Sequence, residues 1–114
     1  MKVTYDNNKA KYMESDLALI KKLGPEKAKT VRRIIDTLQA SVNVQVFLKT
    51  APGRPHALSG NHKGEYAVTV TANYRLIFEV VQESDNLKNL TKVEIVRVKG
   101  VVDYHGENEE WLMP

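Results

Sequence analysis

Three short segments of this sequence bring together residue types that suit acid–base chemistry on a phosphate. They are His56-Ala57-Leu58-Ser59-Gly60, Asn73-Tyr74-Arg75 and Asp103-Tyr104-His105. A histidine transfers protons near neutral pH, and an arginine stabilises the charge that develops on a phosphate in its transition state. The segments therefore predict a metal-free site for phosphodiester cleavage. The candidate catalytic residues are His56, Arg75, Asp103, Tyr104 and His105.

Two of these residues also have plainer interpretations that the sequence leaves open. Arg75 stands at the start of a predicted strand, where it could pair with Glu65 or Glu79 across a sheet. His56 follows the Pro- and Gly-rich segment 51–55, and a histidine in such a loop often has no special role. Residue type alone does not decide between a catalytic site and an ordinary surface.

The third motif has the same ambiguity. Asp103 and His105 lie two positions apart, so in a strand both would face the same way and the carboxylate could orient the imidazole. The alternative is a strand-end pair that caps a loop. Tyr104 is expected to point inward as a core tyrosine. Three histidines can hold zinc, but His56, His62 and His105 lack the close spacing of zinc ligands. We therefore expect no metal and no cofactor.

Composition predicts one globular domain in the cytoplasm. The chain has 114 residues, of which 42% are hydrophobic and 27% charged, close to globular averages. No window approaches the roughly 18 consecutive apolar residues of a membrane span, and the polar start lacks the apolar region of a signal peptide. The absence of cysteine excludes disulfides and thiolate metal sites. The net charge of +3 is mild and leaves binding to nucleic acid open.

Two helices are predicted in the first 40 residues. Residues 8–23 carry apolar side chains at helical spacing, and Gly24 ends this helix. Pro25 opens the second helix, because proline at the first helical position loses no hydrogen bond. The apolar stripe of the first helix is Ala10, Met13, Leu17 and Ile20. That of the second is Ala28, Val31, Ile34, Ile35 and Leu38.

A hairpin of two strands is predicted in the middle of the chain. Residues 65–72 alternate between apolar and polar, and a tight turn at 72–73 leads to a second strand that ends near Val80. Arg75 then lies on the face opposite the core. The inward face of the second strand is Tyr74, Leu76, Phe78 and Val80. Before the hairpin, residues 41–50 allow a short helix or an extended segment, and we favour a short helix or turn that plugs the core.

A further strand is predicted at residues 92–98, with a bulge at Lys99-Gly100 before 101–104 continues it. Residues 1–6 could form a short first strand. Helices that precede a run of strands are typical of the α+β class. We expect two N-terminal helices packed on a curled antiparallel sheet of three to four strands.

The order and spacing of these motifs resemble HigB-type toxins of the RelE/ParE superfamily. The resemblance covers residues 1–105, expected to form the toxin domain, and leaves 106–114 as a C-terminal tail. The matching elements are His-x-Leu-x-Gly at 56–60, Lys63-Gly64, the strand 66–72, Asn73-Tyr74-Arg75-Leu76-Ile77-Phe78, and Asp103-Tyr104-His105.

The resemblance implies the toxin component of a type II toxin–antitoxin system. Such a toxin enters the ribosomal A site and cuts messenger RNA without metal, with the RNA 2′-hydroxyl as nucleophile. Arg75 would bind the scissile phosphate, while His56 and the 103–105 segment would transfer protons or contact RNA. The implied partners are the ribosome, messenger RNA and a cognate helix-turn-helix antitoxin, through which the toxin would oligomerise.

Binding to the ribosome would require a basic surface. Its candidates are Lys27, Lys29, Arg32, Arg33, Arg54 and Lys63. The plainer interpretation of the charges between Lys27 and Arg33 is an ordinary solvated helix face.

Three features depart from the family. Active members carry basic residues where this chain has Ser59 and Thr71, and His62 or Lys63 would have to compensate. The loss of two cations leaves open a toxin with another target, such as DNA gyrase, or a homologue that only binds an antitoxin. The tail after His105 is also unusual, and it could pack on the body, bind a partner or fray.

Overall fold

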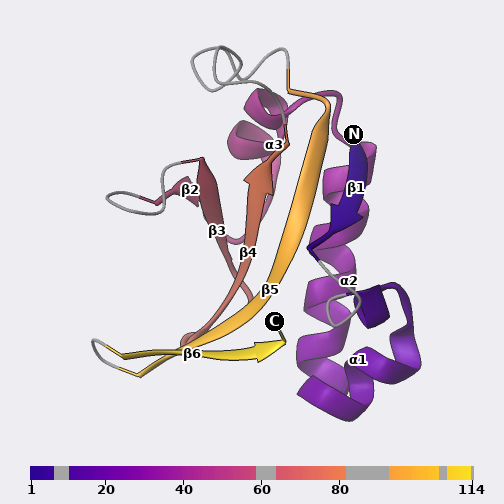
Figure 1. Cartoon of the computed structure of the whole chain (residues 1–114), viewed down its shortest axis with the longest axis vertical. Helices are drawn as coiled ribbons and strands as arrows, with labels where there is room; N and C mark the ends of the chain where they lie inside the picture. The colour runs from indigo at the N-terminus through magenta and orange to yellow at the C-terminus, as the bar shows by residue number, and fades with distance from the viewer. Residues whose placement is uncertain (7–10, 59–63, 82–92, 106–107, 114) are drawn as a thin grey trace.

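The computed structural model describes residues 1–6, 11–58, 64–81, 93–105 and 108–113, although only the backbone for 11–12, 104–105 and 108–113 (Figure 1). Four helical segments precede most of the strands along the chain. They are η1 (Lys11–Glu14, a 3-10 helix), α1 (Asp16–Leu23), α2 (Pro25–Ala40) and α3 (Val44–Thr50). The strands are β1 (Lys2–Tyr5), β2 (His56–Ala57), β3 (Glu65–Thr69), β4 (Tyr74–Val80), β5 (Ile95–His105) and β6 (Asn108–Met113).

The strands form one mixed sheet in the order β1-β5-β4-β3-β2, with β6 also paired to β5. The long strand β5 pairs with β4 on one edge, and on the other edge with β1 and then β6. β1 runs parallel to β5, so the prediction of a purely antiparallel sheet of three to four strands is wrong on both points. The physical reason is that the helices form a crossover after β1, and such a connection permits parallel pairing.

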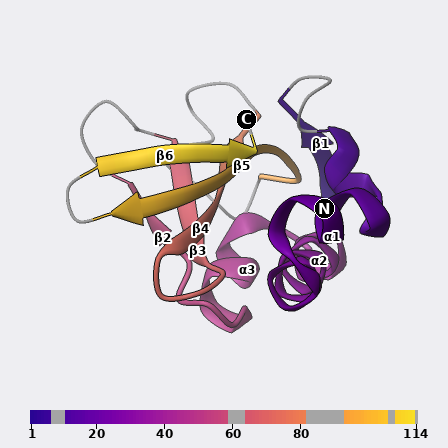
Figure 2. The same ribbon diagram turned by 90° about the horizontal axis from the view of Figure 1, so that it is seen from below.

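The predicted α+β class is confirmed, with the helices on one side of the sheet (Figures 1 and 2). Most of the predicted tail belongs to the sheet, because residues 108–113 are β6 and pair antiparallel with β5 from Val101 to His105. In the described part of the chain, no helix has both the length and the apolar character required to cross a membrane.

The first helix differs from its prediction in both start and phase. Ser15 caps α1, with its side chain accepting a bond from the Ala18 N–H at 3.4 Å, so the α-helix starts at Asp16. The break after η1 rotates the helix, and Leu17 and Ile20 are 73% and 43% exposed instead of buried. Ala10, also in the predicted stripe, lies outside the described residues. The buried apolar residues of this region are Met13, Leu19 and Leu23.

The second and third helices agree with their predictions. α2 begins at Pro25 directly after Gly24, and all five residues of its predicted stripe are buried. The segment 41–50 does contain a short helix, capped by the Asn43 side chain, which accepts a bond from the Val46 N–H at 2.9 Å. This helix buries Phe47 completely, so it plugs the core as expected.

The main core lies between the helices and one face of the sheet. Phe78 of β4 stands edge-on to Phe47 at 5.6 Å and stacks on Tyr66 at 5.3 Å between ring centroids. Leu76 also belongs to this core, and Tyr74 and Val80 pack against it, so the predicted inward positions of β4 are confirmed. A smaller apolar cluster of Ala67, Ile77, Val102 and Leu58 covers part of the opposite face.

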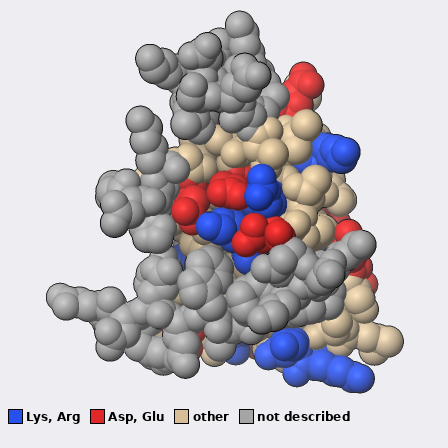
Figure 3. Space-filling view, viewed as in Figure 1, with Lys and Arg blue, Asp and Glu red and all other residues tan. Residues whose placement is uncertain are grey.

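The predicted bulge at Lys99-Gly100 is also confirmed. Ile77 pairs with Gly100 and Phe78 with Val98, so Lys99 is the extra residue, and Gly100 has a positive φ of 146°. On the face of the sheet opposite the helices, Arg97 pairs with Asp6 at 3.7 Å and with Glu79 at 3.4 Å. Lys99 pairs with Glu65 at 3.7 Å. Figure 3 shows these opposite charges intermixed, so this area carries little net charge.

Candidate functional site

The candidate site lies at the end of the sheet where β4 begins and β5 nears its end. Residues 70–74 form the turn that leads into β4, with the N–H groups of Val70 and Thr71 donating to the Tyr74 carbonyl at 2.8 and 3.2 Å. Antiparallel pairing then sets Tyr74 opposite Asp103 and Arg75 opposite Val102. Two of the three sequence motifs therefore meet in the fold.

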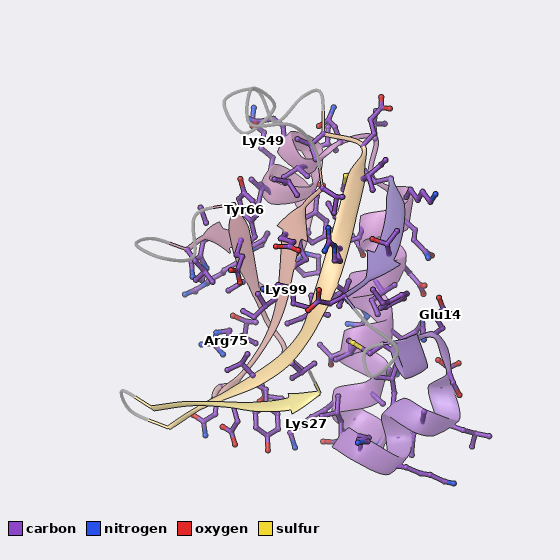
Figure 4. The ribbon with its side chains drawn as sticks, in the orientation of Figure 1. Glu14, Lys27, Lys49, Tyr66, Arg75 and Lys99 are labelled. Carbon is purple, nitrogen blue, oxygen red and sulfur yellow. The ribbon has the colours of Figure 1, made fainter. Side chains whose placement is uncertain are left out.

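Asp103 and Arg75 nevertheless lie on opposite faces of the sheet. Directly opposed residues in an antiparallel pair share a face, and neighbours along a strand alternate. Asp103 therefore shares the helical face with Tyr74, whereas Arg75 lies on the other face with Val102. Figure 4 shows Arg75 projecting from the sheet away from Lys27, which lies on the helical side.

On the helical side, the turn and the start of α2 enclose a cleft of about 340 Å³. The Nζ atom of Lys27 lies 4.7 Å from the centroid of the Tyr74 ring, a cation–π contact that joins α2 to the sheet. Asp103, only 7% exposed, brings a carboxylate into the same cleft. The lining residues are Lys27, Thr71, Ala72, Asn73, Tyr74 and Asp103.

This lining suits a polar ligand with an aromatic or planar part. The ammonium group attracts a phosphate, the phenol ring offers a stacking surface, and Asp103 accepts hydrogen bonds from N–H donors. A second cleft of about 490 Å³ adjoins the first, since Lys27 and Thr71 line both. Together the two clefts extend from the sheet end along the first turn of α2.

On the opposite face, Arg75 is tied to the turn that precedes it. Its Nη1 donates to the carbonyl oxygens of Thr71 at 2.7 Å, Ala72 at 3.2 Å and Tyr74 at 3.0 Å. Among the contacts described for Arg75, all hydrogen bonds use Nη1, so Nε and Nη2 can meet a phosphate while the turn stays braced. The two carboxylates that the sequence offered as partners of Arg75 form ion pairs with other residues. Glu79 pairs with Arg97 and Glu65 with Lys99.

His56 lies on the same face as Arg75 but two strands away. It is exposed in the short edge strand β2 opposite Ala67, which in turn pairs with Ile77 of β4. Strand spacing and rise place the Cα atoms of His56 and Arg75 roughly 12 Å apart. That separation lets the two side chains approach one phosphodiester from either side.

The backbone around His56 orients its imidazole. Its Nδ1 lies 3.1 Å from the Arg54 carbonyl, so the tautomer with a proton on Nδ1 donates there and presents a basic Nε2 to solvent. Arg54 holds a left-handed φ of 50°, between Gly53 with φ 91° and Pro55. The Thr69 N–H donates to the Gly53 carbonyl at 2.8 Å and fastens this loop to the sheet.

The remaining candidate residues are described only in part or not at all. The backbones of Tyr104 and His105 continue β5 opposite Glu109 and Asn108, and their side chains lie outside what is described. Three further residues of the sequence argument, Ser59, His62 and Lys63, also fall outside the described residues. Groups of three or more metal-ligand side chains do not occur within the described ranges.

The basic candidates divide into three kinds. Arg32 is engaged within the fold, because it pairs with Asp16 at 2.8 Å and donates to the Met13 carbonyl. Lys27 lines the cleft, a position that sequence reasoning missed because nothing in the sequence links it to Tyr74. The exposed ones are Lys29, Arg33 and Arg54.

Comparison with solved structures finds the same fold in bacterial toxins. A YoeB/ParE toxin from Agrobacterium tumefaciens is 13% identical, with a TM-score of 0.61 over 92% of this chain and 100% of that chain. The matching chain of the YoeB-YefM complex from Staphylococcus aureus is 15% identical, with a TM-score of 0.58 over 92% and 97%. The chain of the S. aureus YoeB dimer is 14% identical, with a TM-score of 0.56 over 92% of this chain and 97% of that chain.

These likenesses confirm the predicted RelE-like fold and make the chain structurally similar to YoeB/ParE toxins. At these low sequence identities, the comparisons establish the fold and not the function. Protein-family models give no match to the sequence, and curated proteins give none either.

Proposed function

We propose that this chain is a toxin of a type II toxin–antitoxin system that cuts messenger RNA on the ribosome. The observation that carries the proposal is the match of nearly the whole chain to complete YoeB/ParE toxin chains. It is supported by an arginine and a histidine on one sheet face, in the order and spacing that resemble HigB-type toxins.

The proposed reaction needs no group beyond the protein and the RNA. His56 Nε2 takes the proton of a ribose 2′-hydroxyl, whose oxygen attacks the adjacent phosphorus. The P–O5′ bond breaks, leaving a 2′,3′-cyclic phosphate, and the 5′-oxygen takes a proton from an acid that we assign to Tyr104 or His105, because Asp103 lies on the face of the sheet opposite Arg75. Arg75 stabilises the negative charge of the phosphorane through Nε and Nη2.

Partners are proposed on the same basis. Structures of S. aureus YoeB are known in complex with YefM and as a dimer. We expect this chain to bind a cognate antitoxin of the helix-turn-helix kind, to oligomerise through it, and to act in the cytoplasm on the ribosome and messenger RNA.

The test is controlled expression in a bacterium, with growth measured and transcript 5′ ends mapped by primer extension. We expect growth arrest and new ends within translated regions, absent from a reporter whose start codon has been removed. Arg75→Ala should abolish both effects in a folded protein. Growth arrest with intact messages would reject the nuclease proposal.

A second candidate is favoured by the division of the site between two faces. Asp103 lies in the helical cleft, away from Arg75, and Thr71 stands where active family members carry a basic residue. Such a chain would be a toxin with another target, such as DNA gyrase, or a homologue that only binds its antitoxin. Inhibited supercoiling by purified gyrase with intact messages would favour the first, and the absence of growth arrest the second.

A further inference from the structure

Helix α1 is apolar on two sides, and the core uses only one of them. Leu19 and Leu23 are buried against α2 and the core, whereas Leu17 and Ile20 are 73% and 43% exposed. A helix with apolar side chains on both sides is typically covered on both. The exposed stripe that the sequence assigned to the core therefore remains available to another molecule.

A cleft of about 250 Å³ lies directly beside this stripe, between α1 and α2. Ile20, Pro25 and Ala28 supply its apolar part. Asp16 and Arg32 also line the cleft, but they neutralise each other in an ion pair of 2.8 Å. An apolar side chain that enters here meets apolar surface without having to break that ion pair.

The rim around the stripe is basic. Over their whole length α1 and α2 carry six Lys and Arg side chains against three Asp and Glu. Of the six, Lys27 lies at the cleft beside Tyr74 and Arg32 is paired with Asp16, so the rim of the stripe depends on the exposed lysines. Lys29 lines the cleft, Lys21 follows Leu17 by one helical turn, and both are exposed. Lys and Arg side chains gather over the lower end of the helical side in Figure 3.

We propose that Leu17, Ile20 and the cleft beside them form a docking surface for an acidic amphipathic helix of a partner protein. The apolar stripe and cleft receive the partner's apolar side chains, and its flanking Glu and Asp side chains meet Lys21 and Lys29. A groove between two helices fits a third helix with apolar anchors at three- and four-residue spacing.

Two other occupants are disfavoured by the same observations. A second copy of this chain would bring the same basic rim against its own, and like charges across an interface are repulsive. RNA would use the lysines, but its bases stack preferentially on aromatic rings, whereas Leu17 and Ile20 are aliphatic. The surface is independent of Arg75 and His56, so its test does not depend on toxicity.

The test uses a fluorescent synthetic peptide helix with Leu at three- and four-residue spacing and Glu on both flanks, titrated by fluorescence anisotropy. The matched probe carries Lys in place of each Glu. Leu17→Ser/Ile20→Ser is the test variant. Val42→Ser/Val46→Ser is its control, because Val42 and Val46 are 72% and 39% exposed, nearly the same as the test pair.

We expect the acidic peptide to bind the wild type and the Val42→Ser/Val46→Ser control with equal affinity. Its affinity for Leu17→Ser/Ile20→Ser should be lower by about tenfold or more. Lys21→Glu/Lys29→Glu should weaken the acidic peptide and favour the Lys-flanked one. No binding, equal binding of both probes, or equal losses in both serine variants would overturn the proposal. So would displacement of the peptide by a short RNA, or a dimer in sedimentation that Leu17→Ser/Ile20→Ser dissociates.

Discussion

Arg75 has a structural role, in hydrogen bonds to the turn that precedes it, and a proposed catalytic role in binding phosphate. Its Nη1 is shared by three carbonyl oxygens of the turn at 71–74, so the guanidinium braces the segment that also lines the cleft. Arginine suits this double use because its planar group presents donors on several sides, whereas the lysine ammonium is a single point charge. The residue that we expect to contact the phosphate thus also maintains the shape of the site.

We predict that Arg75→Ala lowers the free energy of unfolding by about 1–2 kcal/mol and abolishes RNA cleavage. Arg75→Lys should recover part of the stability but little activity, because one ammonium cannot brace the turn and bind phosphate together. Urea unfolding and primer extension measure the two effects. Arg54→Ala, an exposed arginine outside these bonds, is the control and should leave stability nearly unchanged.

Tyr66 predicts an alkaline limit to stability. Burial raises the pKa of its phenol above the ordinary value of 10.0, because the charged phenolate is poorly solvated beside Phe78. A raised folded-state pKa gives stability that is complete below pH 10 and lost as pH rises through the folded value. Tyr66→Phe should therefore reduce the fall in unfolding free energy above pH 10 and leave its pH dependence below that unchanged.

Tyr5 limits how complete that change can be. Burial also raises the pKa of Tyr5, and the nearby Arg32 partly opposes the effect. A residual alkaline loss is thus expected in Tyr66→Phe. An identical pH profile for wild type and variant would contradict the assignment to Tyr66.

Two connections between elements contain a glycine with a positive φ, one between α1 and α2 and one between α3 and β2. Gly24, with φ 86° and ψ 161°, separates α1 from α2 in a region that only glycine occupies readily. Gly53, with φ 91°, fastens the loop that carries His56 to β3. A Cβ at Gly24 would meet open space, but at Gly53 it would lie 2.9 Å from both the Thr69 oxygen and Val68 Cγ1.

We predict that Gly24→Ala costs about 1–3 kcal/mol of stability from backbone strain alone. Gly53→Ala should cost more, because strain adds to a contact with backbone that cannot move aside easily. It should also reduce activity by displacing His56. Thermal or urea unfolding of the two variants gives the comparison, and equal losses would show that the close contact at Gly53 relaxes freely.

The sheet buries apolar side chains on both of its faces, but to unequal extents. Phe78 packs in the main core between Tyr66 and Phe47, whereas Ile77 belongs to the small cluster that Leu58 helps to cover. The helices cover the first face, whereas in the described part of the chain Leu58 packs on the smaller cluster of the second. Stability should therefore depend far more on the helical face.

We predict that Phe78→Ala lowers the unfolding free energy by about 3–5 kcal/mol and Ile77→Ala by about 2 kcal/mol. Phe78→Ala should also abolish toxicity through loss of the folded protein, whereas Ile77→Ala should keep it. Urea denaturation with a growth assay separates these results. A larger loss for Ile77→Ala would mean that the smaller cluster is the main source of stability.

The local features of this protein could be predicted from its sequence. Its periodicity identified α2, the β3–β4 hairpin and the bulge at Lys99-Gly100, because these depend on neighbours within a few residues. Motif order identified the RelE-like fold, which the structural comparisons confirm. The catalytic roles of Arg75 and His56 stay predictions.

The contacts between residues far apart in the sequence could not be predicted in this way and follow from the fold. It made β1 parallel to β5, turned Leu17 and Ile20 outward, and set Asp103 beside Lys27 on the face away from Arg75. Strand pairing and helix phase depend on how whole elements pack, and a break such as that before Ser15 rotates every following side chain. Spacing along the chain describes a single helix or strand, whereas a site depends on which face each element presents.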